Sequence, residues 1–293
     1  MTAPRSSSTP APSSSPPRSG ATPVPGGDTT RGLLAAYDAQ LRGWAGALPP
    51  GAWQERQGPL LRVAGMHRGY LLPPRELDLD TAGLDRLIAE QREWFAARGE
   101  SVEWKTHAHD LPAEVPERLR AAGFVPEPPE TVMVADTSAI AAHAPDLPAG
   151  VTLRRISARA DLEQFAEVQG TAFGEERPWR AEELARQIEA APQETAVLVA
   201  EAEGEVISGA RLEFEPGTDF AGLWGGGTLP SWRRRGVYRA LVAARAALAR
   251  DRGVRHLRVD ASDRSAPVLL RLGFHALTTT TPYVWTPPES PRV

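Results

Sequence analysis

"PSWRRRGVYRALVAARAALARDRG", residues 230–253, joins an arginine-rich turn to an alanine-rich amphipathic helix. The apolar residues of the helix repeat at helical spacing and form one face: Val237, Leu241, Ala244 and Leu248. Gly253 stands where a glycine often ends a helix, so the helix is predicted to begin at Gly236 or Val237. The free N–H groups and the positive dipole end of such a start bind anions, and neighbouring arginines add phosphate contacts. The turn is therefore predicted to bind phosphate, the alternative being an ordinary solvated helix start.

The composition is that of a globular protein. The chain has 293 residues, of which 41% are hydrophobic, and a formal net charge of −4. This length leaves room for about two domains. The mild acidity provides no global basic field for nucleic acid or anionic membranes. Cysteine is absent, which excludes disulfides, thiolate metal sites and a cysteine nucleophile.

No apolar run approaches the roughly 18 to 20 residues of a membrane-spanning helix. Residues 1–30 also lack the apolar core of a secretory signal. We therefore expect a cytoplasmic protein with no membrane and no nucleic-acid partner. An arginine patch for nucleic acid would need an aromatic platform or a wider basic stripe.

Composition also divides the chain. Residues 1–30 are almost wholly Ser, Pro, Thr, Ala and Gly, which predicts a disordered tail. Small residues and two prolines predict a linker at 138–150. The remaining segments, 31–137 and 151–293, are each predicted to be a domain. Strands interleave with helices, so the expected class is mixed α/β.

The elements of the C-terminal segment follow from periodicity. Strands are expected at 151–156, 195–216 (two strands around Gly204), 220–228, 254–262 and 275–285. Helices are expected at 161–173, 179–191 and 265–272, besides the helix of the opening segment.

An internal repeat links the two domains. Residues 102–135 follow the order strand, acidic turn, short helix, Gly-Phe, strand, and residues 257–285 follow the same order, with LRAAGF matching LLRLGF. Upstream, the helix and terminal glycine of residues 80–99 match those of the opening segment. The pattern predicts two copies of one domain. Two αβ units that merely end their helices with glycine are the alternative.

The opening segment resembles the acetyl-CoA-dependent N-acetyltransferase superfamily, called GNAT. The signature of that family is Gln or Arg, two residues, Gly, one residue, then Gly or Ala, between a strand and a helix. Arg233 and Gly236 fit, whereas Tyr238 replaces the small residue, so its ring would either crowd the pyrophosphate or turn outward. Pro230 and the later LLRLGF also match. The resemblance covers about residues 151–286 and implies two GNAT-like domains in tandem, each a mostly antiparallel sheet flanked by helices.

The resemblance also assigns the acetyl-CoA site. The anchoring turn is Arg233, Arg234, Arg235, Gly236, Val237, Tyr238 and Arg239. The edge at Gly226, Gly227 and Thr228 is implied to splay from its neighbour and pair with pantetheine, although the three glycines 225–227 also suit an ordinary turn. Ser262 stands where the later motif often has Asn.

The first copy is predicted not to bind CoA. Its turn reads LLPPRELDLD (71–80), in which Pro73 and Pro74 remove two backbone donors. Asp78 and Asp80 would repel a pyrophosphate. This copy is expected to pack on the second and wall the acceptor site.

The general base is less defined than the cofactor turn. Glu213 shares one strand face with Arg211 and Glu215 and is the first candidate, the alternative being a solvent-facing carboxylate. Asp260 is second and alternatively caps the next turn. Leu269 stands where many family members carry a tyrosine acid. Tyr283 or Tyr238 is then the substitute, or the thiolate leaves unassisted.

The acceptor is expected at residues 173–180, where Glu175 and Glu176 would attract a cationic amine and Trp179 would give it a flat surface. The same residues also suit an ordinary helix N-terminus. His107 and His109 lie near Asp110, but the domain needs no metal, and none is predicted.

These features predict transfer of an acetyl or small acyl group from acyl-CoA to a primary amine of a small molecule or peptide. The expected protein is a monomer or homodimer. A non-catalytic CoA sensor and an interaction module that has lost CoA are the alternatives.

Overall fold

The computed structural model describes residues 25–43, 46, 48–143, 146–175 and 179–288. The N-terminal unit comprises α1 (Pro25–Leu41), β1 (Trp53–Gln57), β2 (Leu60–Ala64), β3 (Gly69–Leu72), α2 (Thr81–Ala96), β4 (Val102–His107), α3 (Val115–Ala121), β5 (Val125–Pro126) and β6 (Glu130–Asp136). The C-terminal unit comprises α4 (Thr137–Ala141), β7 (Val151–Ile156), α5 (Arg159–Phe173), α6 (Arg180–Ala190), β8 (Thr195–Ala202), β9 (Glu205–Phe214), β10 (Phe220–Thr228), η1 (Pro230–Trp232), α7 (Val237–Arg250), β11 (His256–Ala261), α8 (Ala266–Leu272) and β12 (His275–Trp285).

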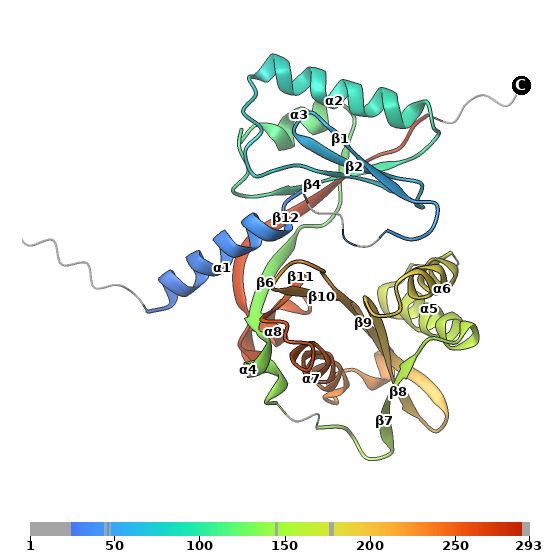
Figure 1. Ribbon diagram of the computed structural model, residues 1–293. Coiled ribbons are helices and arrows are strands. Elements are labelled where there is room, and N and C mark those ends of the chain that lie inside the picture. Colours follow the sequence, from blue (N-terminus) through green and yellow to red (C-terminus); the bar gives the residue numbers. More distant parts are fainter. Residues whose placement is uncertain (1–24, 44–45, 47, 144–145, 176–178, 289–293) are drawn as a thin grey trace, which may run out of the picture.

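Both units contribute to one sheet of twelve strands (Figure 1). The strand order is β1-β2-β3-β4-β12-β6-β11-β10-β9-β8-β7, and β5 pairs with β12. Among the strands of the described residues, β3–β4 and β10–β11 are parallel pairs and the other pairs are antiparallel. The predicted mixed α/β class is confirmed, and the two expected sheets are joined edge to edge.

The units exchange their last strands at this junction. β6, from the N-terminal unit, pairs antiparallel with β11 of the C-terminal unit. β12, from the C-terminal unit, pairs antiparallel with β4 of the N-terminal unit. The two exchanged strands also pair with each other, which makes the sheet continuous.

The backbone confirms the internal repeat. In the first copy Phe124 N donates to Leu119 O at 3.0 Å, and in the second Phe274 N donates to Leu269 O at the same distance. The preceding glycine is left-handed in both copies, with φ of 85° at Gly123 and 100° at Gly273. Each copy also contains a parallel strand pair that is only three residues long.

Helices cover the two sheet faces differently. The α7 face, covered by α2, α3, α4, α7 and α8, holds the two largest apolar clusters. On the opposite α1 face, Tyr37 of α1 packs on Val132, Val134 and Phe220 near the junction. Farther along this face, Phe165 and Leu184 of α5 and α6 pack on β8. Between α1 and the α5–α6 pair, the α1 face carries charged side chains, which are described below.

The ends of the predicted segments differ from the structure. α1 begins at Pro25, inside the segment predicted as a tail, and residues 1–24 lie outside the described part. The first part of the predicted linker lies in α4. The ranges predicted for three strands are those of β7, β10 and β12. In the described ranges no helix is both long and apolar enough to cross a membrane.

Candidate active site

An opening separates β10 from β11. These strands pair only where Phe220–Gly222 meets His256–Arg258, and the described parts of both strands make no further pairs with each other. Beyond that point β10 is irregular, with a register shift between Trp224 and Gly227. The strand edge at Gly226, Gly227 and Thr228 therefore faces the opening, as the splay expected from the resemblance requires.

Close neighbours explain the glycines of this edge. A β-carbon on Gly225 would lie 2.6 Å from Gln169 Nε2, and the same amide donates to the Gly225 carbonyl. A β-carbon on Gly226 would lie 2.7 Å from Tyr238 Cε2. Thr228 is fixed instead by its hydroxyl, 2.7 Å from Ser208 Oγ. The edge is thus closely packed, with Gly227 buried and Gly226 and Thr228 half-buried.

The start of α7 has the features of an anion site. Gly236 is its N-cap, with a left-handed φ of 90° and no side-chain cap in the described structure. The first helical bond runs from Ala240 N to Gly236 O at 3.0 Å, which leaves the N–H groups of Val237, Tyr238 and Arg239 at the helix start. The Val237 side chain is buried in the core, so this residue offers only its backbone.

The arginines of the turn have different surroundings. Arg233 donates to Thr228 O at 3.1 Å and to Ala172 O at 2.9 Å, so it joins the end of β10 to the end of α5. The Arg235 guanidinium lies 4.9 Å from the centre of the Trp232 ring. Arg234 and Arg239 are exposed. Arg233 is therefore held by protein carbonyls, and the other three side chains are at the surface.

Tyr238 lies inward, against Gly226. Burial raises the pKa of Tyr238, and the neighbouring Ser265 side chain opposes this shift. Ser262 is exposed, with its Oγ 3.3 Å from Ser265 Oγ. The ring therefore connects α7, β10 and the start of α8 beside the opening. The other candidate acid, Tyr283, is buried in the core under α2 and α3.

The equivalent helix start in the N-terminal unit is already capped. Asp80 Oδ1 accepts a hydrogen bond from Gly83 N at 2.7 Å, and Asp80 is the N-cap of α2. A carboxylate thus occupies the place of an external anion. Pro73 and Pro74 follow β3, so the turn also has fewer donors.

Charged side chains line the α1 face beside the opening. The acids are Glu103, Glu130, Glu213, Glu215 and Asp260, and the bases are Lys105, Arg211 and Arg258. Four ion pairs connect them: Arg211 Nη1–Glu213 Oε1 at 2.9 Å, Arg258 Nη2–Glu215 Oε1 at 2.6 Å, Lys105 Nζ–Asp260 Oδ2 at 2.7 Å and Lys105 Nζ–Glu130 Oε2 at 3.8 Å. The acids outnumber the bases, which favours a cationic ligand.

The two predicted bases differ in accessibility. The side chain of Asp260 is 2% exposed. Burial alone would raise its pKa, but Lys105 and Arg258 hold the pKa of Asp260 below its ordinary value. Glu213 is 25% exposed and lies opposite Gly222, where β10 still pairs with β11. Asp260 is thus a buried counter-ion, and Glu213 lies at the closed end of the opening.

Glu130 is a carboxylate that the sequence did not single out. Its side chain is 33% exposed and lies 3.8 Å from Lys105 Nζ. Burial raises the pKa of Glu130 to about 7, with Lys105 opposing the shift and Asp260 adding to it. No motif marks this residue, because its position depends on the exchange of β6.

Several buried polar atoms at this face have no partner in the described structure. They are Arg211 Nε, Trp224 Nε1, Glu215 Oε2 and Asp260 Oδ1. Such atoms favour a bound water or a polar ligand, because an unpaired buried group costs free energy.

The predicted acceptor residues are partly used by the protein itself. The Trp179 ring stacks on His67 of the N-terminal unit, with centroids 4.1 Å apart and planes at 19°. The Arg180 guanidinium lies 4.6 Å from the Trp179 ring. Glu175 N donates to Gly170 O at the end of α5, and Glu176 lies outside the described residues. The indole thus contacts the other unit rather than forming an open platform.

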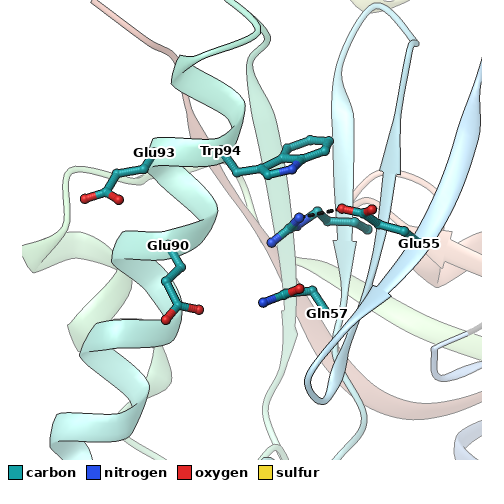
Figure 2. A pocket seen from close by; sticks show the side chains of 6 residues that line it. Glu55, Gln57, Glu90, Glu93 and Trp94 are labelled. Atoms are coloured by element: carbon teal, nitrogen blue, oxygen red, sulfur yellow. Dashed lines mark hydrogen bonds and ion pairs between the residues drawn. The ribbon is translucent and has the colours of Figure 1, made fainter.

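A cavity of about 530 Å³ lies elsewhere, between α2 and β1–β2 (Figure 2). Its lining residues are Glu55, Gln57, Arg62, Glu90, Glu93 and Trp94, none of which was predicted for the site. Arg62 is paired there with Glu55 at 2.6 Å. This cavity is not part of the opening between β10 and β11.

The histidines near Asp110 make local hydrogen bonds. His107 pairs with Tyr37 Oη at 3.1 Å, and His109 lies 3.0 Å from Asp38 Oδ2. Asp110 accepts from Arg42 at 2.7 Å. A search of the described residues finds no group of three potential metal ligands.

Comparisons with known proteins agree with this geometry. Residues 162–274 match the acetyltransferase (GNAT) family. A GCN5-related N-acetyltransferase from Kribbella flavida is similar over 89% of this chain and 96% of its own, with 18% identity and a TM-score of 0.62.

Another solved structure, a tandem GNAT protein from the clavulanic acid biosynthesis pathway, is similar over 90% of this chain and 97% of its own, with 18% identity and a TM-score of 0.58. At this identity the structures show the fold alone. No curated protein matches. Residues 162–274 are therefore similar to the acetyltransferase (GNAT) family, and the chain as a whole has the fold seen in the tandem GNAT protein.

Proposed function

We propose that the protein transfers an acetyl or small acyl group from acyl-CoA to a primary amine of a small molecule or peptide. The GNAT fold implies acyl transfer from CoA. The observation that carries the proposal is the uncapped start of α7 beside the open edge of β10. The N-terminal unit, whose corresponding helix is capped by Asp80, has a structural role in this proposal.

In this assignment the pyrophosphate binds the N–H groups at the start of α7. The exposed Arg234, Arg235 and Arg239 add charge, whereas Arg233 holds the turn in place. Pantetheine lies along the edge of β10, and backbone N–H groups of the irregular segment polarise the thioester carbonyl. Tyr238 is the candidate acid for the leaving thiolate, because its hydroxyl lies beside the opening.

The amine is proposed to enter from the α1 face. The excess of carboxylates there attracts a cation. In this proposal the Trp179 ring lines the amine site from the C-terminal unit, and His67, which stacks on it, lines the site from the N-terminal unit. Glu175, at the end of α5, remains a proposed contributor, and so does Glu176, which lies outside the described residues.

A thermal-shift titration with acetyl-CoA tests the assignment. A ligand at 100 times its Kd stabilises the fold by about 2.7 kcal/mol. Gly236→Pro should abolish the shift, since proline cannot adopt the left-handed conformation of that residue. Gly253→Pro is the matched control, because Gly253 is also left-handed (φ 76°) but lies beyond the other end of α7.

Thiol release from acetyl-CoA with a panel of primary amines then tests transfer. Binding without release for any amine would favour the CoA sensor. A folded wild type that shows no shift at saturating acetyl-CoA would contradict the proposal and favour the interaction module.

A further inference from the structure

The strand exchange brings a residue of the N-terminal unit to the opening in the C-terminal unit. β6 runs antiparallel to β11, and Thr131 pairs with Ala261. Glu130, the first residue of β6, therefore lies at the C-terminal end of β11. β10 runs parallel to β11, so its irregular segment is at the same end of the sheet.

Glu130 also points to the side from which the amine is proposed to enter. It is two residues before Val132, which pairs with Asp260, so Glu130 and Asp260 share the α1 face. Lys105 reaches the same place from β4. Two strands of the N-terminal unit, β4 and β6, and β11 of the C-terminal unit thus bring one base and two acids together.

The two acids contact Lys105 differently. Asp260 is almost fully buried and lies 2.7 Å from Lys105 Nζ, whereas Glu130 is one-third exposed and lies 3.8 Å away. Asp260 therefore fixes the ammonium group in place. Glu130 keeps an accessible carboxylate that can accept a proton from a bound molecule.

We propose that Glu130 is the general base of the acyl transfer and that Lys105 and Asp260 position it. This inference rests on the proposed function. The Glu130 carboxylate takes one proton from the ammonium of the acceptor. The freed amine attacks the thioester carbonyl, the C–N bond forms and the C–S bond breaks. Tyr238 gives its hydroxyl proton to the departing sulfur and takes up the second amine proton, which gives the amide and CoA thiol, and Glu130 returns its proton to water.

The electrostatics agree with this role. A general base works best when its pKa is near the working pH, and the pKa of Glu130 is raised by burial to about 7. Lys105 opposes this shift, while Asp260, Glu103 and Glu127 add to it. Glu213, by comparison, is paired with Arg211 at the closed end of the opening.

The test measures thiol release from acetyl-CoA between pH 5.5 and 9, with glycinamide, phenylalaninamide and spermidine as amine probes. Glu130→Gln should lower kcat by roughly 10²- to 10⁴-fold, with the KM for acetyl-CoA unchanged. Lys105→Met should move the acidic limb of kcat/KM to higher pH, because Lys105 lowers the pKa of Glu130. Glu163→Gln is the matched control, since Glu163 is an exposed carboxylate of α5 that pairs with Arg159.

A second measurement needs no acceptor. The ordinary pKa of a glutamate, 4.5, is below the folded value of about 7, so ionising Glu130 costs stability as pH rises between these values. Glu130→Gln should therefore have a higher Tm than the wild type at pH 8 and the same Tm at pH 4.5.

Each outcome decides something. Equal activity and an unchanged acidic limb in Glu130→Gln would overturn the assignment of the base and leave the proposed function standing. A loss confined to Glu213→Gln would transfer the role to Glu213. If the wild type releases no thiol with any probe, the proposed function fails and the base assignment fails with it.

Discussion

Lys105 is the only lysine of the chain, and its replacement by methionine should destabilise the protein at neutral pH. Its ammonium group lies 2.7 Å from Asp260 Oδ2, and the Asp260 side chain is 2% exposed. Removing one partner of a buried ion pair costs roughly 3 to 5 kcal/mol, because the remaining charge is left uncompensated. Lys105 is itself 23% exposed and Arg258 stays near Asp260, so we expect about 3 kcal/mol, at the low end of that range. At about 2 to 4 °C per kcal/mol for a protein of this size, Tm should fall by about 6 to 12 °C.

The pH dependence follows from the pKa of Asp260. In the wild type this pKa is below the ordinary 3.8, so its stabilising contribution is present above pH 3.8 and is lost as pH falls through the folded pKa. Without Lys105 the pKa of Asp260 rises. The deficit of Lys105→Met should therefore shrink between pH 8 and pH 4, as Asp260 takes up a proton.

A double-mutant cycle with thermal and urea unfolding checks this reasoning. Lys105→Met, Asp260→Asn and the double variant are compared with the wild type at pH 8 and pH 4. The double variant should be more stable than Lys105→Met, since no orphan carboxylate remains. The reasoning would be refuted if Lys105→Met lowered the free energy of unfolding by less than about 1 kcal/mol. It would also be refuted if the free-energy changes of the two single variants added up to that of the double variant, because the pair would then not be coupled.

Three further changes test individual contacts. Asp80→Ala should cost about 1 kcal/mol by removing the cap of α2 and should leave the acetyl-CoA shift intact; loss of that shift would implicate the N-terminal unit in binding. Gly209→Ala would place a β-carbon on the Phe165 ring, so urea unfolding should show a loss of roughly 1 to 3 kcal/mol, largely recovered by Phe165→Leu in the same chain. Tyr238→Ala should raise the kcat/KM for butyryl-CoA relative to acetyl-CoA, because the ring lies on Gly226, and an unchanged ratio would show that the ring does not limit the acyl group.

Local elements of the fold could be predicted from the sequence. β7 alternates, β10 is an apolar run followed by three glycines, and β12 carries a β-branched run; the ranges of all three were predicted to the residue. The start of α7 was predicted from Gly236, because a turn with a left-handed backbone favours glycine. The structure has φ of 90° at this residue. The repeat could be seen in the sequence because both copies place Gly-Phe after a short helix. The two glycines, Gly123 and Gly273, have the same left-handed conformation, which accounts for the shared glycine.

The strand order could not be predicted in this way. The sequences of β6 and β12 have the pattern of ordinary strands. Neither sequence indicates that the strand pairs with the sheet of the other unit. Lys105 and Asp260 are 155 positions apart, and their contact exists only because of that exchange. Glu130 was overlooked for the same reason, since the role proposed for it depends on its neighbours in space.

The predicted acceptor and phosphate residues also have neighbours that the sequence could not reveal. Trp179 was expected to offer a flat surface to the amine, but the ring already stacks on His67, which lies more than a hundred positions earlier. Arg233 was expected at the phosphate, but its guanidinium is bonded to two backbone carbonyls. In both cases the residue type indicated a planar or cationic group, but the sequence did not show which neighbour in the protein that group contacts.

The shared sheet has a consequence for synthesis on the ribosome. β12 is the last described strand to be translated, yet it fills the space between β4 and β6. Until it emerges, the nascent N-terminal unit exposes an unpaired edge of β4, and such edges promote association with other chains. β6 must likewise wait for β11. The edge of β4 therefore stays unpaired during most of the time taken to translate the chain. A translational pause before residue 275 would lengthen that exposure.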